Sequence, residues 1–191
     1  SRGLGDVYKR QDLKLKVELL LAKRKYSVDG PSHTVESAGK KGLRSGKVSE
    51  LTAIAPLKPG GADRLRKIIE LIKGDFGGAI LVGTLHDMRF VFIDNDTRLL
   101  FCTTFDGDWD VYIEDFATKI PELMDLIFES VEGWPGIKDP SVKQYILDHQ
   151  LTADAWFVAY PNLTVNDVLR NEKIVKGLYK TLDEAQDSSQ H

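Results

Sequence analysis

The residue types best suited to chemistry gather in one stretch of the chain, at His86, Asp87 and Arg89. An imidazole titrates near neutral pH, so His86 suits the role of a general base or of a haem ligand. Asp87 and Arg89 are two residues apart and therefore point to the same face of a strand, where their ion pair could orient an anionic ligand or a proton donor. The same pair could instead be a structural contact in a dimer interface, and the sequence leaves both interpretations open.

A second group of acidic residues begins at Asp106, where the spacing D-x-D-x-D is similar to the start of a calcium loop. Such a loop needs glycine at its sixth position and glutamate at its twelfth, and this chain has Val111 and Ala117 there, so calcium is excluded. Acidic residues are favoured just before a helix N-terminus, which is the interpretation that we expect. The sequence contains no Walker loop, dinucleotide glycine pattern or zinc-ligand spacing, and no metal is expected.

Cys102 is the only cysteine, so the chain has no intramolecular disulfide framework and no metal site made of clustered cysteines. We expect its thiol to be buried and inert as a nucleophile. Thr104 follows two residues later, and both side chains share a predicted strand face with Arg89. Cys102 and Thr104 are therefore candidate ligand-binding residues.

A predicted hairpin positions these side chains. Residues 79–93 and 98–105 are rich in Val, Ile, Phe and Thr, and the Asp-Asn-Asp-Thr segment between them is typical of a turn. Pairing Ile93 with Arg98 gives a first face with His86, Met88, Phe90 and Phe92 opposite Phe105, Thr103, Phe101 and Leu99. The second face has Asp87, Arg89, Val91 and Ile93 opposite Thr104, Cys102, Leu100 and Arg98. His86 is thus expected under the helices with a structural role, and a joint site with Arg89 would need a β-bulge.

The remaining periodicities complete a small fold. They predict a strand at 50–57, a helix at 62–73, a long helix from Trp109 interrupted at Pro121, a short helix after Asp139-Pro140, a strand at 153–160 and a last helix from Thr164. This order favours an α+β, ferredoxin-like antiparallel sheet with helices on one face, spanning residues 48–186.

Helices on one face would leave the second face of the hairpin open. Val91, Ile93 and Leu100 on that face are apolar enough to favour a partner sheet. Two such sheets packed face to face would make a homodimeric α+β barrel with a polar cavity near Asp87 and Arg89.

The N-terminal quarter of the chain differs from the rest in charge. Residues 1–47 carry a net charge of +7 and the other residues a net −10. Residues 1–11 resemble the translated cloning sequence that recurs in metagenomic reading frames, residues 12–26 fit a strand or a short helix, residues 27–47 indicate a linker, and residues 187–191 indicate a disordered tail. The basic residues are interrupted and include one aromatic neighbour, Tyr26, which favours a solvated arm over nucleic-acid binding.

The composition is ordinary for a globular protein, with 42% hydrophobic and 29% charged residues. No apolar run approaches the ~20 residues that cross a bilayer, and no signal segment is recognisable. These features favour a cytoplasmic protein without a membrane partner.

The segments GTLHDMRFVFIDN (83–95) and LLFCTTFDGDWDVYIEDF (99–116) resemble members of the dimeric α+β barrel superfamily, which includes dye-decolourising-peroxidase-like, chlorite-dismutase-like and small monooxygenase proteins. The resemblance implies a ferredoxin-like fold, a sheet-to-sheet dimer and a cavity for haem or a small molecule. Dye-decolourising peroxidases have a G-x-x-D-G motif whose aspartate assists peroxide cleavage. The matching residues here are 103–107, with Thr103 in place of the first glycine and Asp106 in the aspartate position, and no proximal haem histidine can be assigned.

Two functions follow as expectations. The first is an oxidative enzyme acting on a small organic molecule in the barrel cavity, either haem-peroxidase-like or cofactor-free and monooxygenase-like. Its candidate catalytic residues are Asp87, Arg89, His86 and Asp106, with Thr104 and Cys102 binding the ligand. The alternative is a non-catalytic dimer that binds a small molecule or serves a stress response.

Overall fold

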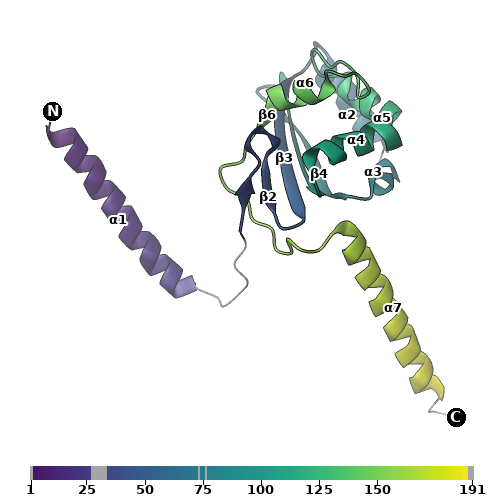
Figure 1. Cartoon of the computed structure of the whole chain (residues 1–191). Coiled ribbons are helices and arrows are strands. Elements are labelled where there is room, and N and C mark those ends of the chain that lie inside the picture. Colours follow the sequence, from purple (N-terminus) through teal and green to yellow (C-terminus); the bar gives the residue numbers. More distant parts are fainter. Residues whose placement is uncertain (1, 27–33, 73, 76, 189–191) are drawn as a thin grey trace. The chain divides into compact units, whose positions relative to one another are not determined.

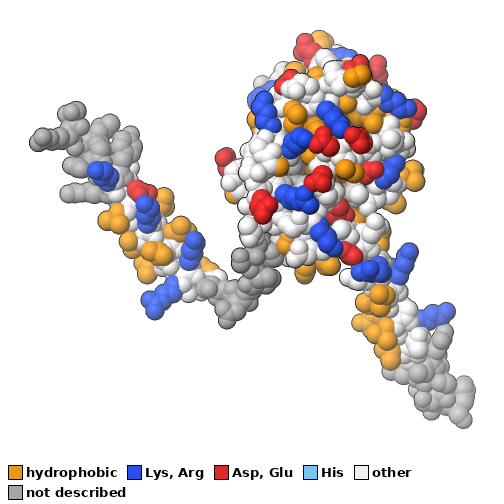
Figure 2. All heavy atoms as spheres, viewed as in Figure 1, with side chains coloured by type: hydrophobic (Ala, Val, Ile, Leu, Met, Phe, Trp, Pro, Cys, Tyr) orange, Lys and Arg blue, Asp and Glu red, His pale blue; other side chains and the backbone are white. Residues whose placement is uncertain are grey.

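A computed structural model of the chain describes residues 2–26, 34–72, 74–75 and 77–188. The chain forms two compact units, residues 1–32 and residues 33–191. The described part of the first unit, residues 2–26, forms the helix α1 (Arg2–Tyr26) (Figure 1). The two possibilities for residues 12–26, a strand or a helix, are thereby resolved in favour of a helix. Figure 2 shows apolar side chains along α1, and those of Leu13, Leu20 and Leu21 are more than 60% exposed.

The second unit is built on an antiparallel sheet of six strands. The strands are β1 (Glu36–Ser37), β2 (Leu43–Ser45), β3 (Val48–Pro56), β4 (Leu85–Ile93), β5 (Arg98–Asp106) and β6 (Gln150–Leu151). Their order is β1-β2-β3-β5-β4, and β6 pairs with β3. Because β5 lies antiparallel between β3 and β4, these three strands have the split arrangement of a ferredoxin-like fold. The expected α+β class with an antiparallel sheet is confirmed.

The helices of this unit are α2 (Gly61–Ile72), α3 (Gly77–Val82), α4 (Trp109–Lys119), α5 (Pro121–Phe128), α6 (Val142–His149) and α7 (Val165–Ser188), with a 3₁₀ turn at Gly39–Lys41. Figure 1 shows α2 to α6 gathered on one side of the sheet. Pro121 separates α4 from α5 as predicted, because a proline is tolerated at the start of a helix but not in its interior. The predicted last helix, α7, begins after Thr164, where Thr164 and Asp167 form a reciprocal cap: the Asp167 N–H donates to Thr164 Oγ1, and the Thr164 N–H donates to the Asp167 carboxylate.

The hairpin of β4 and β5 follows the predicted register over most of its length. Ile93 pairs with Arg98, and the pairing continues without interruption to Asp87 and Thr104. The Phe-rich face lies under the helices as expected: Phe101 is in edge contact with Phe128 of α5, and Phe105 stacks on Tyr112 of α4 with ring centroids 3.8 Å apart. These aromatic contacts form the centre of the hydrophobic core.

Three expected elements are wrong. Residues 79–84 do not begin the strand; α3 occupies 77–82, Gly83 at φ 77° ends it, and β4 starts at Leu85. The expected linker at 27–47 holds β1 and β2, and β2 pairs with β3 and buries Leu43 and Ser45. The compact unit therefore begins before residue 48, while residues 27–33 lie outside the described part.

The expected strand at 153–160 is also absent, since the only strand near it is the two-residue β6, which pairs with Thr52 and Ala53. The cause is competition for one edge: β2 pairs with the N-terminal end of β3, where a longer fourth strand would have to bind. The helix α7 extends to Ser188, so the tail expected at 187–191 lies mostly outside the described residues.

Candidate functional site

A β-bulge in β4 places His86 on the face opposite to the expected one. Leu85 pairs with Phe105 and Asp87 pairs with Thr104, so His86 is an extra residue without an opposite partner. The bulge puts Leu85 against the core and turns His86 to the open face of the sheet. The expectation that His86 lies under the helices is therefore wrong.

The apolar pattern of the strand explains this bulge. Leu85, Met88, Phe90 and Phe92 all pack on the helix side, with a spacing of three residues at the first step and two at each later step. A regular strand would bury an imidazole and expose Leu85, which costs apolar burial. The break in spacing is the sequence signal that could have located the bulge.

His86 and Asp106 form the closest polar contact of the site. The His86 Nε2 lies 2.6 Å from Asp106 Oδ1, and the two side chains are 25% and 10% exposed. The other carboxylate oxygen, Oδ2, accepts the Val165 N–H at 2.8 Å, at the first residue of α7. The carboxylate is therefore held from two sides, and an imidazole that donates its Nε2 proton to it keeps Nδ1 as the basic nitrogen.

His86 borders a hollow of about 430 Å³ on the open face of the sheet, and Asp106, its partner, is not itself among the described lining residues. Its polar walls are His86, Asp87, Arg89 and Thr104, so the bulge brings together four of the six residues expected from the sequence. The remaining walls are apolar or aromatic: Val48, Trp156, Phe157, Val158, Ala159, Tyr160, Leu163 and Val168.

Arg89 is the positive group of the hollow. Its Nε lies 4.0 Å from Asp87 Oδ1, and the two side chains are 65% and 52% exposed, so the expected ion pair is present but weak. The terminal nitrogens of Arg89 form no hydrogen bond or ion pair with the other described residues, which leaves their N–H groups available to a ligand.

The segment 156–160 supplies the aromatic wall, which was not expected from the sequence. Its alternating apolar and aromatic residues indicated a strand, and the segment instead runs across the open face. Two features hold it there: the Lys47 N–H donates to the Pro161 carbonyl at 2.7 Å, and Gly46, at φ 58°, packs against Pro161. A side chain at Gly46 would collide with Pro161 and Asn162, directly after this segment, so the β2–β3 turn holds the C-terminal end of the wall.

A buried hydrogen-bond chain supports the strand just past the bulge. The Thr103 hydroxyl donates to the Asp87 carbonyl at 2.9 Å, so the Tyr112 hydroxyl, 2.8 Å away, must donate to Thr103 Oγ1. Burial raises the pKa of Tyr112 well above its usual value, which keeps this hydroxyl protonated. This hydrogen-bond chain connects the helix α4 to the part of β4 that carries polar residues of the hollow.

The other candidates lie outside the hollow. Cys102 is half-buried on the same sheet face, paired with Arg89 and Thr52, but it is not among the lining residues. Asp108 is the residue before α4, as expected, although its side chain makes no cap hydrogen bond and instead pairs with Arg44. Asp110 pairs with Lys41 and Lys143, whose ammonium groups hold the pKa of its carboxyl below the usual value.

His86 and Asp106 do not fit the site of a haem peroxidase. The aspartate of such a site must be free to move a proton for peroxide, whereas both oxygens of Asp106 are occupied by His86 and Val165. Among the described residues, no cluster of three or more His, Cys, Asp and Glu side chains could hold a metal ion. Within the same part of the chain, no helix combines the length and hydropathy of a membrane span.

No protein-family model matches the chain, and no curated protein or solved structure is significantly similar to it. Function must therefore be argued from the site itself.

Proposed function

We propose that this domain is an enzyme that removes a proton from a small organic anion bound in the hollow on the open face of the sheet. The contact between His86 and Asp106 at the wall of the hollow carries the proposal. A histidine held by a carboxylate through one ring nitrogen presents the other as a general base in a defined orientation.

The proposed step moves one proton from the substrate to His86 Nδ1. The imidazole becomes an imidazolium, whose charge is balanced by the Asp106 carboxylate at 2.6 Å. The electron pair of the broken bond stays on the substrate as an anion. Arg89 binds the substrate's acidic group, and Trp156 with Tyr160 offers flat apolar surface to its carbon skeleton.

The family resemblance implies an oxidative activity, and the proposal includes this activity only in its cofactor-free form. The substrate carbanion left by the deprotonation would donate its electron pair to dioxygen to form a C–O bond, and the proton held by the imidazolium would complete a hydroperoxide at that carbon. Haem has no part in it, because Asp106 is committed to His86 and Val165.

The test follows the proton without knowledge of the full reaction. A panel of small α-keto acids, β-keto acids and phenolic carboxylates is incubated with the protein in D₂O, and deuterium incorporation at carbon is measured by NMR. We expect catalysed exchange in at least one compound and a loss of at least ~100-fold in His86→Gln, the usual contribution of a general base.

Two variants separate the roles. His149→Gln is the matched control, because His149 donates to the Tyr145 carbonyl of its own helix. Arg89→Gln should weaken binding of the acids more than it slows exchange at saturation. Exchange that is equally fast in wild type and His86→Gln would refute the base. Binding of the acids without any exchange would favour the alternative, a non-catalytic binding protein.

The proposal includes a homodimer formed through the open face. Beside the hollow, on the same sheet face, lie the apolar residues Ile54, Leu100 and Val91, and Val91 is 44% exposed. A second sheet packed here would bury this strip and close the hollow from solvent.

Sedimentation measures this directly. We expect a dimer at micromolar concentration that Val91→Lys converts to a monomer, because a lysine there places a charge in an apolar contact. Val111→Lys, at a 57% exposed position on α4, is the matched control and should remain dimeric. A wild-type monomer at that concentration would refute the dimer.

A further inference from the structure

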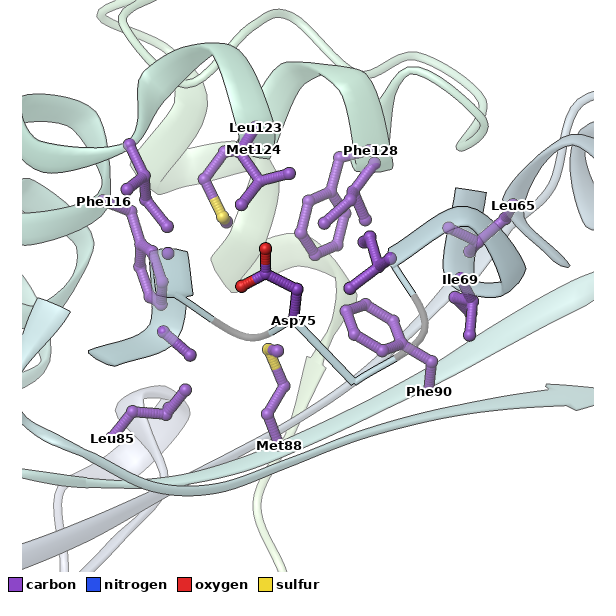
Figure 3. A pocket seen from close by; sticks show the side chains of 15 residues that line it. Leu65, Ile69, Asp75, Leu85, Met88, Phe90, Phe116, Leu123, Met124 and Phe128 are labelled. Atoms are coloured by element: carbon purple, nitrogen blue, oxygen red, sulfur yellow. The ribbon is translucent and has the colours of Figure 1, made fainter. Parts of the chain in front are cut away.

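A second cavity lies on the helix-covered side of the same hairpin. It has a volume of about 240 Å³, is partly open to solvent, and is lined by residues of α2, α3, α4, α5 and β4 and of the segment between α2 and α3 (Figure 3). Met88 and Phe90 of β4 face this chamber, and the alternating residues Asp87 and Arg89 face the hollow. The two cavities are therefore on opposite faces of one strand, and no described residue lines both of them.

The chamber has the properties of a binding site for a hydrophobic molecule. Protein cores are densely packed, so an apolar void much larger than a water molecule is uncommon, and such voids take up apolar ligands rather than water. Of the described residues that line it, Asp75 alone carries a polar side chain, and the others are aliphatic, aromatic or glycine. Met88 and Met124 line it with flexible thioethers, which adapt to ligands of different shape.

Asp75 indicates the polar group of the ligand. Figure 3 shows its carboxylate directed among the lining side chains, and its Oδ1 accepts the Gly77 N–H at 3.1 Å. An ionised carboxylate accepts hydrogen bonds but cannot donate them. It therefore favours a ligand that donates a hydrogen bond, and it repels a ligand that is itself an anion. The residue is exposed, so a charged ligand group beside it would stay in contact with water.

We propose that this chamber binds a small hydrophobic amine, with its hydrocarbon part among Met88, Met124 and Phe90 and its ammonium group at Asp75. The site is separate from the hollow, and its ligand differs in charge from the anion proposed there.

The two methionines of the chain are both in the chamber, which makes them selective probes. The protein is labelled with [¹³C-methyl]methionine, and the two methyl signals are followed during titration with phenethylamine, propylbenzene and 3-phenylpropionate. We expect both signals to shift with the amine, at concentrations at least ~10-fold lower than with the hydrocarbon, and not to shift with the carboxylate.

Two pairs of variants test the assignment. Ala79→Phe fills the chamber from α3 and should abolish the shifts, whereas Ile80→Phe, at the next, 76% exposed position, should leave them intact. Asp75→Asn should remove the preference for the amine over the hydrocarbon, and Asp154→Asn, at an exposed position after β6 that does not line the chamber, should not. Methyl signals that respond to none of the three compounds in the wild-type protein would overturn the proposal, and so would a preference for the carboxylate.

Discussion

Replacing Thr103 with valine tests whether the buried hydrogen-bond chain holds the strand beside the bulge. Thr103 is 2% exposed, and its hydroxyl joins the Asp87 carbonyl to the Tyr112 hydroxyl. Valine preserves the shape but removes both hydrogen bonds, which contribute about 1 kcal/mol each, and leaves the Tyr112 hydroxyl buried without an acceptor, at a further cost of about 1–2 kcal/mol. We therefore expect Thr103→Val to lower the free energy of unfolding by about 3–4 kcal/mol.

The sharper expectation concerns the double variant. Tyr112→Phe alone removes one hydrogen bond and should cost about 1 kcal/mol, because Thr103 can still donate to Asp87. In the double variant no buried tyrosine hydroxyl is left without a partner, so its cost should fall to about 2 kcal/mol, below that of Thr103→Val alone.

Urea denaturation of the wild type, the two single variants and the double variant measures these free energies of unfolding. In thermal unfolding, each kcal/mol should lower Tm by about 2–4 °C for a unit of this size. Thr104→Val is the matched control, since its hydroxyl makes no hydrogen bond with the described residues, and its effect should stay within about 0.5 kcal/mol. If the loss of unfolding free energy in the double variant equals the sum of the losses in the two single variants, the hydrogen-bond chain does not act as a unit.

Two further predictions concern glycine positions and pH. Gly61→Ala should destabilise the domain because the new methyl group would collide with the Ser130 carbonyl oxygen, while Gly177→Ala, which meets nothing within 4 Å in the exposed helix α7, should stabilise it by about 0.5–1 kcal/mol; thermal unfolding gives both signs, and a neutral Gly61→Ala would contradict the packing there. The hydrogen bonds from Thr164 lower the pKa of Asp167 from 3.8 to about 2. A lowered pKa stabilises the folded state above the unfolded value, so the cap at the start of α7 should be retained above about pH 4 and lost between about pH 4 and pH 2. The protection of the Thr164 and Asp167 amides from hydrogen exchange reports that loss. In Asp167→Ala the Thr164 amide and the amide of residue 167 should be less protected already at pH 6, and their protection should not fall further between about pH 4 and pH 2.

Local signals in the sequence were sufficient where one interaction dominates. The Asp-Asn-Asp turn fixes the hairpin register because three consecutive residues there adopt positive φ, between 52° and 67°. The alternation of Met88, Phe90 and Phe92 then assigns the helix-covered face without knowledge of any other element.

The errors arise where two parts of the chain compete for one place. The segment 153–160 alternates like a strand, but β2 already pairs with the end of β3 that this segment would need, and the linker-like composition around β2 concealed that competition. In the same way, the regular register and the burial of Leu85 cannot both be satisfied, and the burial of Leu85 prevails through a bulge.

The site depends on both of these outcomes together. The bulge brings His86 to the open face beside Arg89, but the imidazole has a fixed orientation only because Asp106 is itself held by the Val165 N–H at the start of α7. Val165 reaches that point because the segment before it crosses the open face instead of extending the sheet. A fourth strand at 153–160 would take Trp156 and Tyr160 away from the hollow and leave the His86 side chain in open solvent. The failed strand and the bulged strand therefore have one structural consequence, a polar pocket with an aromatic wall on a sheet face that a regular ferredoxin-like fold leaves bare.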